Sequence, residues 1–113
     1  MWRVLFVPEA ASEFDELPAR ERSALQEAIR KLEALGDQLG APHTSSVRGV
    51  AYSLRELRPR RGSSPWRALY RRIGDVMVIG AIGPEAQKNR NAFNRAVALA
   101  VSRLGEFEVQ GED

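Results

Sequence analysis

The chain has 113 residues, with 17 Lys/Arg, 15 Asp/Glu and one histidine, and a formal net charge of +2 at pH 7. This length predicts one domain over residues 1–113, and a hydrophobic fraction of 43% supplies one modest core. The absence of cysteine excludes disulfides and thiolate chemistry, and the single histidine, His43, argues against a histidine-rich metal site. No apolar run approaches the roughly 20 residues that span a membrane, so we expect a cytoplasmic protein. We also expect no metal and no cofactor.

The first predicted elements are a strand and a helical hairpin. The apolar run over residues 2–7 predicts a strand. Pro8 stops this strand and opens a short helix, because proline is favoured at the first helical position. Pro18 ends that helix and begins a second one over residues 18–35, where Leu and Ile recur at spacings of three and four. Gly36 is the expected C-terminal stop of the second helix.

The middle of the chain predicts three antiparallel strands. Residues 36–50 are loop by composition, and strands are expected over residues 52–58, 66–72 and 76–82. A polar turn over residues 59–65 joins the first two strands, and Gly74-Asp75 is a two-residue hairpin turn between the last two.

The C-terminal part predicts a final helix over residues 89–104, ended by Gly105, and then an acidic tail over residues 106–113 that frays. The element order is therefore β-α-α-β-β-β-α. We expect an α+β fold, with a small antiparallel sheet and the helices packed on one of its faces.

Positive charge is concentrated in the middle of the chain. Residues 48–95 contain 11 of the 17 Lys/Arg and three of the 15 Asp/Glu, whereas acids outnumber basic residues in both flanks. Arginines at fixed positions on adjacent strands form a rigid cationic surface, and such a surface suits a phosphate backbone.

Side-chain alternation along the strands suggests how this surface forms. Neither strand 52–58 nor strand 66–72 has a purely apolar face, so either both are edge strands or the sheet face opposite the helices is an open polar groove. Such a groove would bind RNA through Arg55, Arg58, Arg67 and Arg71, with Tyr70 nearby. Arginine meets phosphate in two-point contact, and tyrosine can stack a base or serve as an acid. Since an ideal strand cannot place both Arg55 and Arg58 on one face, one of them must reach in from an edge or a bulge.

Glu56 has two interpretations. Beside these arginines its pKa would be lowered, so we expect it to orient an arginine rather than act as a base. Alternatively, Arg55, Glu56 and Arg58 form cross-strand ion pairs on a solvated face and bind nothing.

The motif order resembles the RelE/ParE toxin superfamily, and in particular its HigB-like, phage-derived branch. The resemblance rests on the opening Trp2 strand, the helical hairpin that ends at Leu35-Gly36, and the motifs Leu54-Arg-Glu-Leu-Arg58 and Trp66-Arg-Ala-Leu-Tyr70. It runs from about Trp2 to Leu104, which is nearly the whole chain.

This resemblance implies the toxin of a type II toxin–antitoxin system, a ribosome-dependent mRNA endonuclease that inhibits translation without a metal. It implies that Arg67 stabilises the transition state and Arg58 positions the phosphate, with Glu56 and Lys88 completing the catalytic set. RNA-binding positions would be Arg55, Arg60, Arg61, Tyr70, Arg71 and Arg90. The implied partners are a helix-turn-helix antitoxin, the ribosome and mRNA, and an oligomer can form through the antitoxin complex.

The chain departs from the branch at several positions, and at two of them an expected cation is missing. Pro84 and Glu85 stand where that branch usually carries cations, and this favours an alternative class: a ParE-like topoisomerase inhibitor, or a degenerate toxin that acts only as a binding protein. The nuclease hypothesis predicts that Arg67→Ala abolishes growth inhibition and mRNA cleavage while the domain stays folded.

Overall fold

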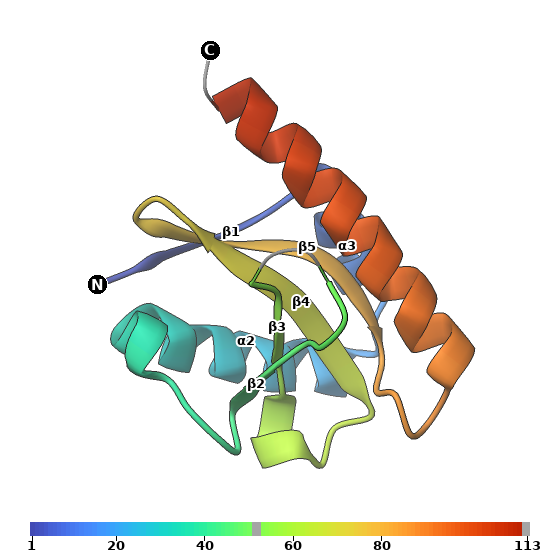
Figure 1. The fold of residues 1–113 in the computed structure, drawn as a ribbon. Coiled ribbons are helices and arrows are strands. Elements are labelled where there is room, and N and C mark those ends of the chain that lie inside the picture. Colours follow the sequence, from blue (N-terminus) through green and yellow to red (C-terminus); the bar gives the residue numbers. More distant parts are fainter. Residues whose placement is uncertain (51–52, 112–113) are drawn as a thin grey trace.

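The computed structural model describes residues 1–50 and 53–111 (Figure 1). Its helices are α1 (Pro8–Asp15), α2 (Ala19–Leu35) and α3 (Arg90–Gly111), with short 3₁₀ turns η1 (Gly36–Gln38) and η2 (Pro59–Gly62). Its strands are β1 (Arg3–Phe6), β2 (Thr44–Ser46), β3 (Arg55–Leu57), β4 (Trp66–Ile73) and β5 (Val76–Pro84). The α+β class and the predicted order of the longer elements are confirmed.

The five strands form one sheet in the order β1-β5-β4-β3-β2. The predicted meander is present as β3, β4 and β5, with Gly74-Asp75 as the turn between β4 and β5. Two features differ from the prediction. The strand β1 pairs in parallel with β5, so the sheet is mixed, and β2 lies inside the segment expected to be loop. A three-residue polar strand such as β2 has too few residues to show an alternating pattern. Tyr52, in the predicted strand 52–58, lies outside the described residues, and β3 begins at Arg55.

The helices cover both faces of the sheet, which corrects the expectation of one covered face. A Cβ atom placed on Gly83 of β5 would lie 2.6 Å from Ala96 Cβ, so α3 packs directly on this strand. On the opposite face Arg72 of β4 pairs with Asp37, just after α2, and stacks over Trp2 with its Cζ 4.8 Å from the ring centroid. The near-continuous apolar run of β5 is typical of a strand that is buried on both sides.

The helix signals in the N-terminal half are confirmed. Pro8 occupies the first turn of α1, and Pro18 is the N-cap of α2. Gly36 ends α2 with a φ of 53°, a left-handed conformation that glycine adopts without strain. A Cβ on Gly36 would also lie 2.1 Å from the indole nitrogen of Trp2, so no larger residue fits there.

The C-terminal prediction is wrong in one respect: α3 passes through Gly105 and continues to Gly111 instead of fraying from residue 106. Tertiary contacts explain the longer helix. Leu104 is fully buried and Phe107 packs against the core, while Glu108 accepts a hydrogen bond of 2.9 Å from Arg71 on β4. These contacts offset the helix cost of one glycine, which is about 1 kcal/mol.

Candidate nucleic-acid interface

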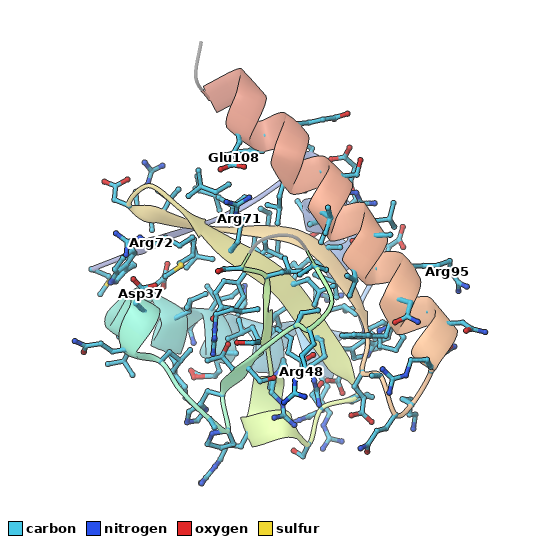
Figure 2. The ribbon with its side chains drawn as sticks, in the orientation of Figure 1. Asp37, Arg48, Arg71, Arg72, Arg95 and Glu108 are labelled. Atoms are coloured by element: carbon cyan, nitrogen blue, oxygen red, sulfur yellow. The ribbon has the colours of Figure 1, made fainter. Side chains whose placement is uncertain are left out.

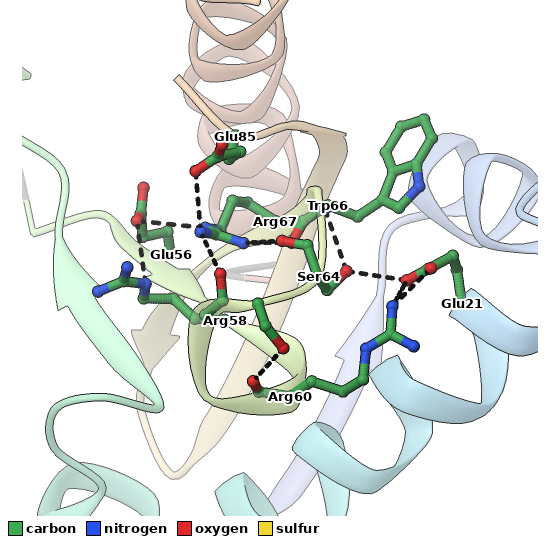
Figure 3. Close-up of polar contacts among 10 residues, drawn as sticks. Glu21, Glu56, Arg58, Arg60, Ser64, Trp66, Arg67 and Glu85 are labelled. Atoms are coloured by element: carbon green, nitrogen blue, oxygen red, sulfur yellow. Dashed lines mark hydrogen bonds and ion pairs between the residues drawn. The ribbon is translucent and has the colours of Figure 1, made fainter. Parts of the chain in front are cut away.

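Arg67, at the start of β4, is buried, with 2% of its side chain exposed. Its Nη1 donates to the carbonyl oxygens of Ser64 at 2.7 Å and Trp66 at 2.9 Å (Figure 3). Its Nη2 donates to the carbonyl of Gly62 and to Glu85 Oε2, both at 3.2 Å. Burial lowers the pKa of Arg67, and the negative charges of Glu56 and Glu85 partly oppose that shift. The guanidinium therefore links the end of the η2 turn to the start of β4 and to Glu85, which directly follows β5.

The predicted role of Arg67 in direct transition-state contact does not fit this environment. Both terminal nitrogens already donate to protein oxygens, and almost none of the side chain reaches the surface. Arginine is rarely fully buried unless it is paired, and here carbonyls and carboxylates supply the partners. Arg67 is better described as a residue that positions its neighbours.

Glu56 lies between Arg67 and Arg58 (Figure 3). Glu56 Oε1 is 3.5 Å from Arg67 Nε and 3.8 Å from Arg58 Nε, with 17% of the Glu56 side chain and 32% of the Arg58 side chain exposed. Its contacts fit the expectation that Glu56 orients an arginine. They also support part of the alternative, because Glu56 and Arg58 do form an ion pair. Arg58 is the more accessible cation of this cluster.

The predicted groove of four arginines is not formed, because Arg55 lies on the opposite face from Arg67. Arg55 pairs in register with Tyr70, whereas Glu56, on the other face, pairs with Leu69. Arg55 donates to Ser46 Oγ at 3.0 Å and to Thr44 Oγ1 at 3.3 Å.

The predicted stacking role of Tyr70 does not fit its position, because the ring is not available at the surface. The side chain is buried, with 2% of the residue exposed, and its hydroxyl lies 2.8 Å from Thr44 Oγ1. On the α3 face, the predicted RNA-binding residue Arg71 is paired with Glu108 at 2.9 Å (Figure 2).

The two arginines of the η2 turn have different surroundings. Arg60 and Arg61 both adopt left-handed backbone conformations, with φ of 52° and 58°. Arg60 is anchored, since its Nη2 donates to both oxygens of Glu21 on α2, at 2.8 and 2.6 Å. Ser64 Oγ also donates to Glu21, at 2.9 Å. Arg61 is exposed.

Glu21 predicts an acid-sensitive contribution to stability. Its partial burial acts to raise the pKa, but hydrogen bonds from Ser64 and Arg60 and the charges of Arg60 and Arg20 together lower the pKa below the usual 4.5. A lowered folded-state pKa stabilises the fold above pH 4.5, and that stabilisation is lost as the pH falls through the folded-state value. We therefore expect the difference in unfolding free energy between wild type and Glu21→Gln to be largest at neutral pH and to shrink as the pH falls below 4.5.

Urea unfolding at a series of pH values measures this difference. Glu27→Gln is the control, because Glu27 makes an exposed ion pair with Arg30, and such pairs contribute little. A gap between wild type and Glu21→Gln that stays constant from pH 7 to about pH 3 would contradict the assignment.

Exposed cations border a groove between residues 46–50 and α3, on the same side as Glu56. Its volume is about 760 Å³, and its polar lining is contributed by Ser46, Arg48, Glu56, Arg90 and Asn94. Lys88 is also exposed, in the turn that precedes Arg90, and its backbone N–H donates to the carbonyl of Glu85 at 3.1 Å. The apolar part of the groove is formed by Val47, Val50, Ala86, Phe93, Val97, Ala98 and Val101.

Sequence reasoning counted Arg48 in the basic segment but did not predict it as a site residue. Its position in a Gly/Ser-rich loop carries no periodic signal, and only the fold brings it to the same groove as Arg90. Figure 2 shows Arg48 on the loop in front of the sheet, while Arg95 points away from the sheet on the outer side of α3.

Two other classes of site are not formed by the described residues. Within residues 1–50 and 53–111, no group of three or more His, Asp or Glu side chains is placed to hold a metal ion. Among the helices of the same described ranges, none is both long and apolar enough to cross a membrane.

Three solved structures that share this fold are of RelE proteins. A double mutant of E. coli toxin RelE in the free state has a TM-score of 0.61 at 19% identity, covering 86% of this chain and 95% of that one. The isolated E. coli RelE toxin has a TM-score of 0.60 at 19% identity, covering 84% and 98%. The archaeal RelE–RelB complex from Pyrococcus horikoshii OT3 gives 0.54 at 17%, covering 74% and 93%.

At such low identity these structures establish a shared fold: the chain has the fold of the RelE toxins. Membership of a family is shown by the match of the sequence to a family model. Residues 12–100 match the family described as phage derived protein Gp49-like (DUF891), and the chain belongs to this family. No curated protein matches it.

Proposed function

We propose that this protein is the toxin of a type II toxin–antitoxin pair, in the HigB-like branch, and that it cleaves mRNA at the ribosome. The observation that carries the proposal is the group of accessible cations around Glu56: Arg58 beside it, and Arg48 and Arg90 along the same groove. Membership of the Gp49-like family and the fold shared with RelE toxins support the same conclusion.

The reaction that these residues suit needs no metal. The ribose 2′-hydroxyl loses its proton to water as its oxygen attacks the adjacent 3′-phosphorus, the bond to the 5′-oxygen breaks, and that oxygen takes up a proton from water. The products are a 2′,3′-cyclic phosphate and a 5′-hydroxyl. Negative charge on the phosphate grows in the transition state, so fixed cations beside it accelerate cleavage.

Each residue has a distinct part in this proposal. Arg58 meets the scissile phosphate, because it is the more accessible of the two arginines that pair with Glu56. Glu56 orients Arg58, and Arg67 holds Glu56 and the η2 turn in place from inside the protein. Lys88, which is exposed in the turn before α3, supplies a second cation to the phosphate.

The groove predicts a specific pattern of RNA binding. Arg48→Ala and Arg90→Ala should each weaken the binding of a single-stranded RNA several-fold, and each should reduce the slope of log K against log salt by about 0.7, since each removes one phosphate contact. Arg95→Ala is the control, because it removes one exposed arginine from the same helix on the side away from the groove. Fluorescence anisotropy at several salt concentrations measures all three variants, and equal losses in all of them would contradict a binding groove at Arg48 and Arg90.

The proposed partner is a helix-turn-helix antitoxin. One of the solved structures with this fold is a RelE–RelB complex, which supports a protein partner that blocks the toxin. We expect expression of this chain alone to arrest growth, and co-expression with a neighbouring helix-turn-helix frame to restore it. Growth that continues normally in the absence of any antitoxin would contradict the toxin assignment.

A second candidate function is ParE-like inhibition of a topoisomerase. Glu85 favours it, because this carboxylate lies 3.2 Å from Arg67 Nη2 and adds negative charge beside the proposed phosphate site. A gyrase supercoiling assay separates the two functions. Inhibited supercoiling with intact ribosome-bound mRNA would establish the second function and exclude the first.

A further inference from the structure

A second cationic hollow lies between α2 and the end of the sheet, outside the groove described above. Its volume is about 330 Å³, close to the lower limit of roughly 300 Å³ for ligand sites. The basic side chains that line it come from separate elements: Lys31 from α2, His43 from the segment before β2, and Arg58 and Arg60 from the segment after β3. The rest of the lining is Ser23, Ala24, Glu27 and Ala28.

The charges of this hollow do not cancel. Arg60 is neutralised by Glu21, and Glu27, the one acid in the lining, is neutralised by Arg30 at 2.8 Å. Among the described residues Lys31 makes no ion pair, and it is exposed on α2. The hollow therefore presents a surplus of positive charge, with Lys31 as its main source.

Arg58 connects the hollow with the groove. Its side chain lines the hollow, while its Nε lies 3.8 Å from Glu56, which lines the groove on the α3 side. Cationic side chains thus continue from Arg90 and Arg48, past Arg58, to Lys31 on α2. A chain with one phosphate per nucleotide matches a series of cations at successive positions, whereas a single small anion would use only one of them.

We infer that this hollow binds a backbone phosphate of the same RNA strand that passes Arg58, so that the RNA footprint extends around the end of the sheet to α2. The inference rests on the proposed function, since it assigns a further contact to the same substrate. Lys31 acts as the point charge for this phosphate, and the Ser23 hydroxyl lies in the same lining as a neutral donor.

The test uses the purified full chain and a labelled single-stranded RNA of about 12 nucleotides, which is long enough to reach both sites. Lys31→Ala should weaken binding about 3- to 10-fold and reduce the salt slope by about 0.7, as expected for one phosphate contact. Lys31→Glu should weaken binding further, and Lys31→Arg should retain it. Arg3→Ala is the matched control, because it removes one exposed charge on β1, the strand at the opposite edge of the sheet.

The outcomes separate this inference from the proposed function. If Lys31→Ala and Arg3→Ala lose equal RNA affinity and Arg48→Ala loses more, the hollow does not bind RNA. The proposed RNA binding in the groove is then still supported. Wild-type protein that binds no RNA would overturn both. If Lys31→Ala keeps its RNA affinity but loses affinity for the helix-turn-helix partner, the hollow is a protein contact and the inference is wrong.

Discussion

Replacing Arg67 with alanine is expected to lower the free energy of unfolding by about 3–5 kcal/mol, the usual loss when one partner of a buried ion pair is removed. The substitution leaves Glu56 and Glu85 without their central cation, and it leaves the carbonyls of Gly62, Ser64 and Trp66 without their donor. This expectation replaces the one drawn from the sequence, in which Arg67→Ala loses activity but stays folded. Urea unfolding of both proteins gives the difference directly.

The control for this prediction is Arg30→Ala. Arg30 also pairs with a glutamate, but 67% of its side chain is exposed, and such helical pairs contribute about 0.2–0.5 kcal/mol. An Arg67→Ala protein as stable as the Arg30→Ala protein would show that Arg67 does not hold the η2 turn. In that case a loss of mRNA cleavage in the Arg67→Ala protein would indicate that Arg67 contacts the transition state directly.

Replacing Arg58 with alanine is expected to reduce mRNA cleavage about 100- to 1,000-fold, which is typical when one group that stabilises transition-state charge is removed. The fold should lose less than about 1 kcal/mol, because Arg58 is partly exposed and Glu56 keeps its ion pair with Arg67. Single-turnover cleavage of ribosome-bound mRNA and urea unfolding, measured on the same preparation, separate the two effects.

Two further variants make this result specific. Arg58→Lys keeps the charge without the planar fork, so its cleavage rate should lie between those of wild type and Arg58→Ala. Arg95→Ala should cleave at the wild-type rate. An Arg58→Ala protein that cleaves as fast as wild type would remove Arg58 from the site.

Local signals in the sequence predicted much of the fold because they act through neighbouring residues. Proline at the start of α1, proline before α2, the left-handed Gly36 and the Gly74-Asp75 turn each set the backbone directly. The parallel pairing of β1 with β5 joins residues more than 70 positions apart, and no local pattern specifies it. The continuation of α3 beyond Gly105 likewise depends on distant contacts, including the packing of Phe107 on the core and the ion pair of Glu108 with Arg71.

The candidate site was less predictable, because it depends on register and burial. Alternation tells which residues of one strand share a face, but the pairing of Arg55 with Tyr70 decides which faces of neighbouring strands coincide. This register separates Arg55 from Arg67. The burial of Arg67 also has no sequence signal, since its partners are mainly backbone carbonyls of the turn that precedes β4.

The most direct test of the central claim is whether the purified wild-type chain cleaves mRNA on the ribosome. We predict cleavage in the presence of a metal chelator, with a 2′,3′-cyclic phosphate and a 5′-hydroxyl at the new ends, and its loss in Arg58→Ala. Intact ribosome-bound mRNA at protein concentrations that arrest growth would contradict the account.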